Sequence, residues 1–150
     1  MNDAPVALIT GASSGFGREA AKALVECGWR VFGTSRHREA HEVEGFRLLE
    51  LDVREDESVG RCLDECLSET GGRLDVLVNN AGHVLSGFAE ETSIEEARGI
   101  FETNFFGVVR VTNAVLAVMR RQRSGGLPNR CSRCFRGLAA CRSSRRGTSG

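Results

Sequence analysis

Tyrosine is absent from this sequence of 150 residues, and Lys22 is its only lysine. No tyrosine hydroxyl can therefore serve as a general acid or base in this sequence, and Lys22 is its one lysine candidate. Apolar runs long enough to span a bilayer are also missing, so the sequence predicts no membrane-crossing segment. No basic stretch followed by an apolar block precedes the first predicted strand, and we expect a cytoplasmic protein.

Acidic residues are missing from the last third of the chain. All 20 of them lie at or before Glu102, whereas the segment from residue 103 onward carries ten arginines. The net charge of zero therefore hides an acidic part followed by a basic part. Such an asymmetry is typical of a nucleic-acid-binding tail, and it is also expected of a segment that does not belong to the fold.

Cysteine occurs six times, but its pattern does not predict a disulfide framework. Cys27, Cys62 and Cys66 fall in predicted helices of a protein without an export signal, so we expect reduced thiols there. Cys131 and Cys134 have the spacing of a metal-ligand pair, but neither a second pair nor a nearby histidine accompanies them. The sequence therefore predicts no metal site.

Strand and helix signals alternate along the first 123 residues. Short apolar runs predict strands at residues 6–10, 29–35, 46–51 and 74–78. Apolar residues at helical spacing predict helices at 15–27 and 56–70, a helix opened by the capping box of Ser93 and Glu96, and a helix at 104–123. This alternation is typical of an α/β fold with a doubly wound parallel sheet of the Rossmann type, in strand order 3-2-1-4.

The alternating pattern stops at Arg123. Residues 124–128 read Ser-Gly-Gly-Leu-Pro, which breaks the helix, and the remainder is rich in Arg, Ser, Gly and Cys. Its apolar area is too small to offset the entropy of ordering. We therefore expect a domain at residues 1–123 and a tail at 124–150 that is disordered or encoded out of frame.

The most informative segment is the glycine-rich turn from Thr10 to Gly17, directly after the first predicted strand. Gly11 allows a sharp turn, and the helix that opens next presents unpaired amides and a positive dipole end. A diphosphate fits such a place. Three residues separate Gly11 from Gly15, so the turn differs from the general Gly-x-Gly-x-x-Gly motif, and an ordinary strand-to-helix turn is the alternative.

Four motifs in this order resemble the short-chain dehydrogenase/reductase family, whose members are nicotinamide-dependent oxidoreductases with a Rossmann fold. The motifs are Thr10-Gly-Ala-Ser-Ser-Gly-Phe-Gly17, Leu51-Asp52-Val53, Asn79-Asn80-Ala81-Gly82 and Thr103-Asn104-Phe105-Phe106-Gly107. The resemblance covers residues 5–123. It implies hydride transfer between the nicotinamide of NAD(P) and a small carbonyl or alcohol substrate.

The resemblance also implies which residues bind the cofactor. They are Thr10, Gly11, Ser13, Ser14, Gly15, Phe16, Gly17, Ser35, Arg36, Asp52, Val53, Asn79, Asn80, Ala81 and Gly82. Asp52 is expected to accept a hydrogen bond from the adenine amine, and a turn or a helix cap is its alternative role. Asn104 resembles the family's active-site asparagine. Because asparagine is a poor helix former, we expect either a bent helix with a bound water or a side chain that faces solvent.

The end of the second predicted strand favours one cofactor over the other. A carboxylate there would bond the ribose of NAD and repel the 2′-phosphate of NADP, but this chain has Ser35 and Arg36 instead. Both side chains can pair with a phosphate. The sequence therefore predicts NADP(H) in preference to NAD(H), with a solvated basic loop as the alternative.

The resemblance implies catalytic groups that this sequence lacks. At family spacing the acid–base tyrosine falls near Arg145 and its lysine near Ser149, and only Ser132 lies near the expected serine. A fifth strand and the later helices, which build the substrate pocket and the oligomer interface in the family, are also missing. We therefore expect a truncated oxidoreductase with Asn104 and Ser132 as remaining catalytic residues, little or no activity and no oligomer interface.

An alternative function is a nucleotide-binding module whose basic tail binds nucleic acid or an acidic partner. The clustered arginines favour this alternative. The arginines are not interleaved with aromatic residues, and no recognition motif accompanies them, so nucleic acid is the less favoured partner.

Overall fold

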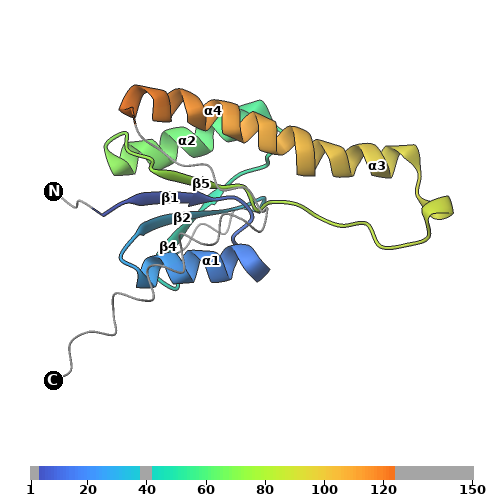
Figure 1. Ribbon diagram of the computed structural model, residues 1–150, viewed down its shortest axis with the longest axis horizontal. Helices are drawn as coiled ribbons and strands as arrows, with labels where there is room; N and C mark the ends of the chain where they lie inside the picture. Colours follow the sequence, from blue (N-terminus) through green and yellow to red (C-terminus); the bar gives the residue numbers. More distant parts are fainter. Residues whose placement is uncertain (1–3, 38–41, 124–150) are drawn as a thin grey trace, which may run out of the picture.

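Five strands form one sheet in the computed structural model, which describes residues 4–37 and 42–123 (Figure 1). The strands are β1 (Val6–Ile9), β2 (Arg30–Ser35), β3 (Glu42–Val43), β4 (Phe46–Glu50) and β5 (Val76–Val78). Their order is β3-β4-β2-β1-β5, and every pairing except that of β3 with β4 is parallel. The four parallel strands confirm the predicted order 3-2-1-4 of a Rossmann-type sheet.

The short strand β3 is a feature that the sequence analysis does not predict. It pairs antiparallel with β4 through a two-residue turn at Glu44 and Gly45, whose φ angles are 51° and 86°. Positive φ at both turn positions matches the twist of a tight hairpin, and Asn-Gly is the usual sequence there. Glutamate seldom adopts positive φ. The sequence Glu-Gly therefore supplies only the glycine of the Asn-Gly pair that would predict a hairpin.

Helices cover both faces of the sheet. Helix α1 (Gly15–Glu26) lies on one face, and α2 (Asp56–Thr70) and α4 (Gly107–Gln122) lie on the other (Figure 1). Each layer has its own apolar core, and all four residues of the central strand β1 are buried between them. The side chains that fill the α1 layer include Ile9, Ala21, Val31 and Phe46, and those of the other layer include Leu8, Phe32, Leu49, Val111 and Val115. Burial on both faces explains the continuous apolar runs of the parallel strands.

The predicted helix at 104–123 is the last part of a longer helical run. After a single turn, η1 (Ala89–Glu91), helix α3 (Ile94–Phe101) begins at the predicted capping box, in which Ser93 and Glu96 satisfy each other's backbone amides. The run continues through the π-helical turn η2 (Glu102–Phe106) into α4. A π turn inserts an extra residue into the helix, and such insertions are frequent at functional sites.

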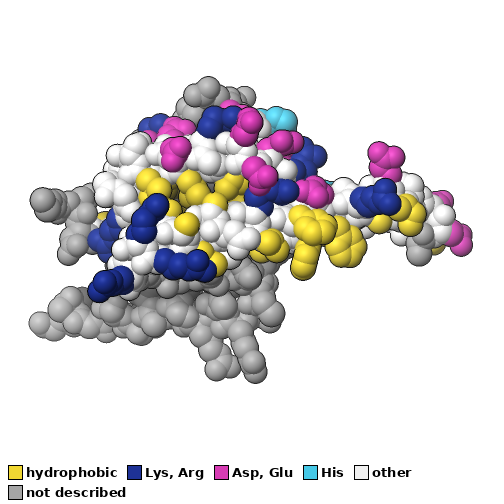
Figure 2. Space-filling view, turned by 90° about the horizontal axis from the view of Figure 1, so that it is seen from above, with side chains coloured by type: hydrophobic (Ala, Val, Ile, Leu, Met, Phe, Trp, Pro, Cys, Tyr) yellow, Lys and Arg dark blue, Asp and Glu magenta, His cyan; other side chains and the backbone are white. Residues whose placement is uncertain are grey.

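The helical run from the end of α3 through the π turn into α4 leaves apolar side chains uncovered. Phe101, Phe105, Phe106 and Val109 are exposed, and hydrophobic side chains gather on this face of the molecule (Figure 2). At the sheet edge, β5 pairs with β1 alone among the strands that the structure describes. Within residues 4–37 and 42–123, no later strand or helix covers this edge or these side chains.

Several predictions concern residues 124–150, which lie outside the described part of the chain. They include Ser132, the pair Cys131 and Cys134, and the basic tail with its proposed partners. Among the helices that the structure describes, none is both long enough and apolar enough to cross a bilayer.

Two of the cysteines agree with the expectation of reduced thiols and one does not. Cys62 and Cys66 are free thiols, buried on the inner face of α2. Burial raises the pKa of each thiol to about 12. Cys27 is disulfide-bonded, so the prediction is wrong at this residue, which lies at the C-terminal end of α1 and outside the core.

We expect Cys62 and Cys66 to resist alkylation by iodoacetamide in the native protein at mildly alkaline pH. The thiolate is the reactive form, and burial keeps both groups protonated there. Mass spectrometry of the α2 peptide measures the labelling rate, with the urea-unfolded chain as control. Equal rates in the native and unfolded samples would contradict the buried position of these thiols.

Candidate functional site

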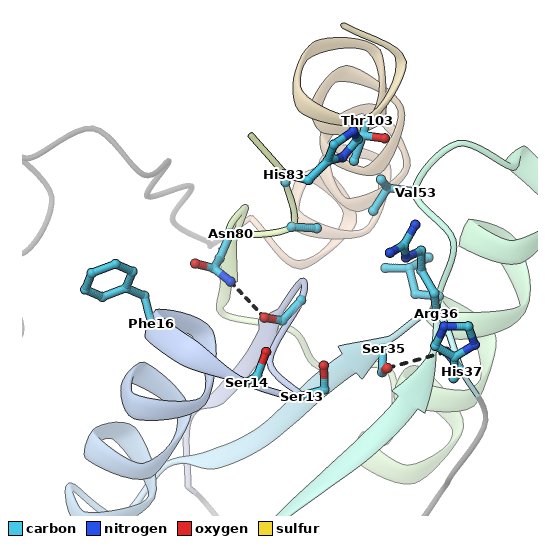
Figure 3. Close-up of a pocket in the computed structure, with 14 residues that line it drawn as sticks. Ser13, Ser14, Phe16, Ser35, Arg36, His37, Val53, Asn80, His83 and Thr103 are labelled. Carbon is cyan, nitrogen blue, oxygen red and sulfur yellow. Dashed lines mark hydrogen bonds between the residues drawn. The ribbon is translucent and has the colours of Figure 1, made fainter. Parts of the chain in front are cut away.

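The carboxyl ends of three parallel strands surround one cavity of about 320 Å³, together with the loop after β4 and the π turn η2 (Figure 3). This is the edge where parallel α/β sheets bind their ligands. The cavity is lined by Gly11, Ser13, Ser14, Phe16, Ser35, Arg36, His37, Leu51, Val53, Asn80, Ala81, Gly82, His83 and Thr103. Its volume lies in the range of small-molecule sites.

The glycine-rich turn forms the floor of the cavity and is tied to the end of β2. The Gly11 amide donates to Thr34 Oγ1 at 3.2 Å, and the Ala12 amide donates to the Thr34 carbonyl at 2.8 Å. Gly11 has a φ of 67°, and a Cβ built there would lie 2.9 Å from the Cα of Ala81. Glycine at this position therefore satisfies both the backbone conformation and the close approach of the loop after β5.

Asn80 joins the loop after β5 to the turn after β1. Its side-chain amide donates to the Gly11 carbonyl at 2.8 Å (Figure 3) and also to the Thr10 carbonyl at 3.1 Å. In return, Thr10 Oγ1 accepts the backbone amides of Asn80 at 3.0 Å and of Ala81 at 2.9 Å. A Cβ at Gly17 would collide with the Gly11 carbonyl and with the Asn80 amide, so this glycine lets α1 approach the network.

The end of β2 contributes a basic rim. Ser35, Arg36 and His37 all line the cavity, and the Arg36 guanidinium lies between Val53 and His37 in Figure 3. The His37 amide donates to Ser35 Oγ at 3.4 Å, which turns the chain sharply after the strand. The lining contains no aspartate or glutamate among the described residues. The rim therefore favours a ligand with negative charge.

Asp52 turns its carboxylate toward Arg54 rather than into the cavity. Its Oδ1 accepts the Arg54 amide at 3.0 Å and Arg54 Nε at 2.9 Å, and its Oδ2 accepts Arg54 Nη2 at 2.6 Å. These hydrogen bonds hold the pKa of the Asp52 carboxyl below its usual range. In this structure Asp52 has the turn-forming role that the sequence analysis gives as its alternative.

The π turn brings Asn104 to the loop after β5. The Asn104 side chain accepts the His83 amide at 3.0 Å and donates to the His83 carbonyl at 2.8 Å. Both ends of the side-chain amide are therefore paired with one backbone residue, which fixes the path of the loop. Asn104 lies in the π turn and is exposed, as the alternative expectation has it, and its side chain is hydrogen-bonded to the backbone of His83.

The cavity gathers most, but not all, of the residues that the sequence predicts for it. The predicted residues that line it are Gly11, Ser13, Ser14, Phe16, Ser35, Arg36, Val53, Asn80, Ala81 and Gly82. Six others lie beside it without lining it, namely Thr10, Gly15, Gly17, Asp52, Asn79 and Asn104. Of these, Thr10 is buried beneath the turn, and Asn79 donates to Thr112 Oγ1 at 3.0 Å on α4.

Four lining residues are not among the binding residues that the sequence predicts: Leu51 and Thr103, which stand within the quoted motifs, and His37 and His83. His37 and His83 directly follow the predicted residues Arg36 and Gly82, and this adjacency is the signal that could have found them. The described residues include no cluster of His, Cys, Asp or Glu that could hold a metal ion.

Comparisons with known proteins agree with this geometry. A family profile described as short chain dehydrogenase matches residues 5–135, which extends past Arg123. The 3-ketodihydrosphingosine reductase of Bacteroides thetaiotaomicron is 44% identical over 124 residues, which cover 83% of this chain and 45% of that protein.

Two solved structures are similar in fold as well as in sequence. A short-chain dehydrogenase from Streptomyces avermitilis has a TM-score of 0.75 and 42% identity, over 84% of this chain and 49% of that one. ElxO with NADP bound has a TM-score of 0.76 and 30% identity, over 84% of this chain and 54% of that one. The chain thus spans about half the length of the relatives that it matches. By its sequence profile and its fold, the chain belongs to the short chain dehydrogenase family.

Proposed function

We propose that this chain binds NADP(H) in the cavity and belongs to an oxidoreductase that acts on a carbonyl or alcohol substrate. The observation that carries the proposal is the meeting of the glycine-rich turn, the basic rim after β2 and the Asn80 loop around one cavity. When bound, the nicotinamide supplies or accepts the hydride. The residues of this chain bind and orient the dinucleotide.

The pyrophosphate is placed at the start of α1. Ser13 and Ser14 line the cavity there, and both hydroxyls can donate to phosphate oxygens. The Ser14 side chain makes no capping hydrogen bond among the described residues, and the first turn of α1 contains no acidic residue. The positive end of the helix dipole is therefore left for an anionic ligand.

The 2′-phosphate is placed at the basic rim. Arg36 can pair with it through two N–H groups, and Ser35 can donate a further hydrogen bond. An NAD-binding site would be expected to hold a carboxylate at the ribose, and the described lining has none. The similarity to ElxO, which was solved with NADP bound, supports the same preference.

The adenine is placed against Val53, next to Asp52. Asp52 remains our candidate acceptor for the adenine amine. Its carboxylate already binds Arg54, so the amine would share it with that arginine. Val53 lines the cavity and supplies an apolar face for the ring.

Turnover by this polypeptide alone is expected to be very low. Reduction of a carbonyl produces an alkoxide that needs a proton, and the sequence contains no tyrosine to supply it. Lys22 is bound to Glu44 at 3.2 Å and to Glu19 at 3.4 Å on α1, and it does not line the cavity. Asn104 remains our candidate for orienting a water or the substrate. Ser132 and the cytoplasmic location stay predictions from the sequence.

Replacement of Arg36 by glutamine tests the phosphate site. A charge-assisted hydrogen bond contributes enough that we expect the Kd for NADPH to rise about ten- to hundred-fold, with little change for NADH. Calorimetric titration with both cofactors measures the two constants. Arg61→Gln is the control, because Arg61 pairs with Glu57 on the exposed side of α2. Equal losses for both cofactors, or no loss, would contradict the NADP preference.

The second test concerns catalysis. Loss of the general acid or base typically costs about 10²- to 10⁴-fold in rate, so we expect NADPH consumption close to the background with any simple aldehyde or ketone. Loss of NADPH absorbance in the presence of a panel of such carbonyls measures it. A robust, protein-dependent rate from the purified polypeptide would show that another group supplies the proton.

A further inference from the structure

One wall of the cavity is made by two residues that are distant in sequence. Val53 comes from the loop between β4 and α2, and Thr103 comes from the π turn η2. Figure 3 shows Val53 between Thr103 and Arg36 along this wall. The wall therefore keeps its shape only if the loop after β4 and the π turn are held together.

Arg110 of α4 contacts both of these segments, although it does not line the cavity. Its Nη1 donates to the Val53 carbonyl at 2.9 Å, and its Nη2 donates to Glu102 Oε1 at 3.0 Å. Its Nε donates to Asp56 Oδ1 at 2.7 Å. The side chain is only 23% exposed, and three acceptors from two separate segments surround it. A planar guanidinium can satisfy three such directions at once, whereas an ammonium group on a flexible stem cannot fix them.

The side chain of Val53 is fixed on the same helix. A Cβ placed on Gly107 would lie 2.6 Å from Val53 Cγ2, so the valine packs directly against the helix backbone. Its carbonyl is held by Arg110, one turn further along. Glu102, the other main partner, begins the π turn that carries Thr103 and Asn104.

We propose that Arg110 is a positioning residue for dinucleotide binding. It holds the Val53 loop and the π turn at the spacing that the dinucleotide needs, without touching the ligand. The inference rests on the proposed dinucleotide site, but not on the preference between NADP(H) and NAD(H). Because the shared part of the two cofactors meets this wall, loss of Arg110 weakens the binding of both by the same factor.

The test compares Arg110→Met with Arg30→Met. Arg30 is a matched control, since it also bonds a carbonyl and a carboxylate, both of Glu69, and it does not line the cavity. We expect Arg110→Met to raise the Kd of NADPH and of NADH by the same factor, about three- to thirty-fold, in calorimetric titrations. Arg30→Met lowers the thermal midpoint but leaves both constants unchanged. Unchanged affinity in Arg110→Met, or equal losses in both variants, would overturn the proposal.

A second measurement needs no ligand, so it separates this inference from the proposed function. Amide hydrogen exchange in Arg110→Met is expected to accelerate in residues 51–54 and 102–106 more than elsewhere. Glu102→Ala removes only the contact with the π turn, and we expect it to accelerate exchange in 102–106 alone. Unchanged exchange at 102–106 in both variants would refute the positioning role. If the wild-type chain binds no dinucleotide while the exchange results appear as expected, the proposed function fails and the role of Arg110 in shaping the wall stands.

Discussion

The hydrogen bonds between Asn80 and the turn after β1 are the constraint on which the site depends. Each parallel strand ends in a different loop, and nothing in the sheet itself fixes where the loops go. Here the Asn80 side chain binds the carbonyls of Thr10 and Gly11, while the Thr10 hydroxyl receives two amides from the other loop. These four hydrogen bonds hold the two loops together as the floor of the cavity, and Gly17 allows α1 to pack against them.

The fold is largely readable from the sequence because its signals are local and periodic. Buried β1 and the amphipathic α2 are marked by their own residues, and right-handed crossovers then give the order of the strands. The hairpin of β3 is different. Its turn has a glutamate at positive φ, a conformation that glutamate seldom adopts, and the Glu44 carboxylate is held by Arg18 and Lys22 of α1, which are distant in sequence.

The sequence indicates which loops meet at the cavity better than it indicates which side chains line it. The motifs place the right segments at one edge, but they do not say which side chains turn inward. Thr10 and Asn79 are polar residues next to the cavity, and both are hydrogen-bonded within the protein instead of lining it. The Asp52 carboxylate accepts hydrogen bonds from Arg54, two positions further along, and does not line the cavity. This pairing depends on side-chain geometry that the sequence does not specify. His83 lines the cavity because Asn104 holds its backbone from 21 residues away.

The central position of β1 has a consequence for the order in which the nascent chain becomes structured. Thr10 and Val78 are 68 residues apart, so β1 leaves the ribosome long before β5 exists to cover its second edge. Parallel pairing across such a separation is slow, because the intervening crossover must be closed first. The turn after β1 is thus among the first segments synthesised, and its bonds to the Asn80 side chain can form only after residue 80 has been added.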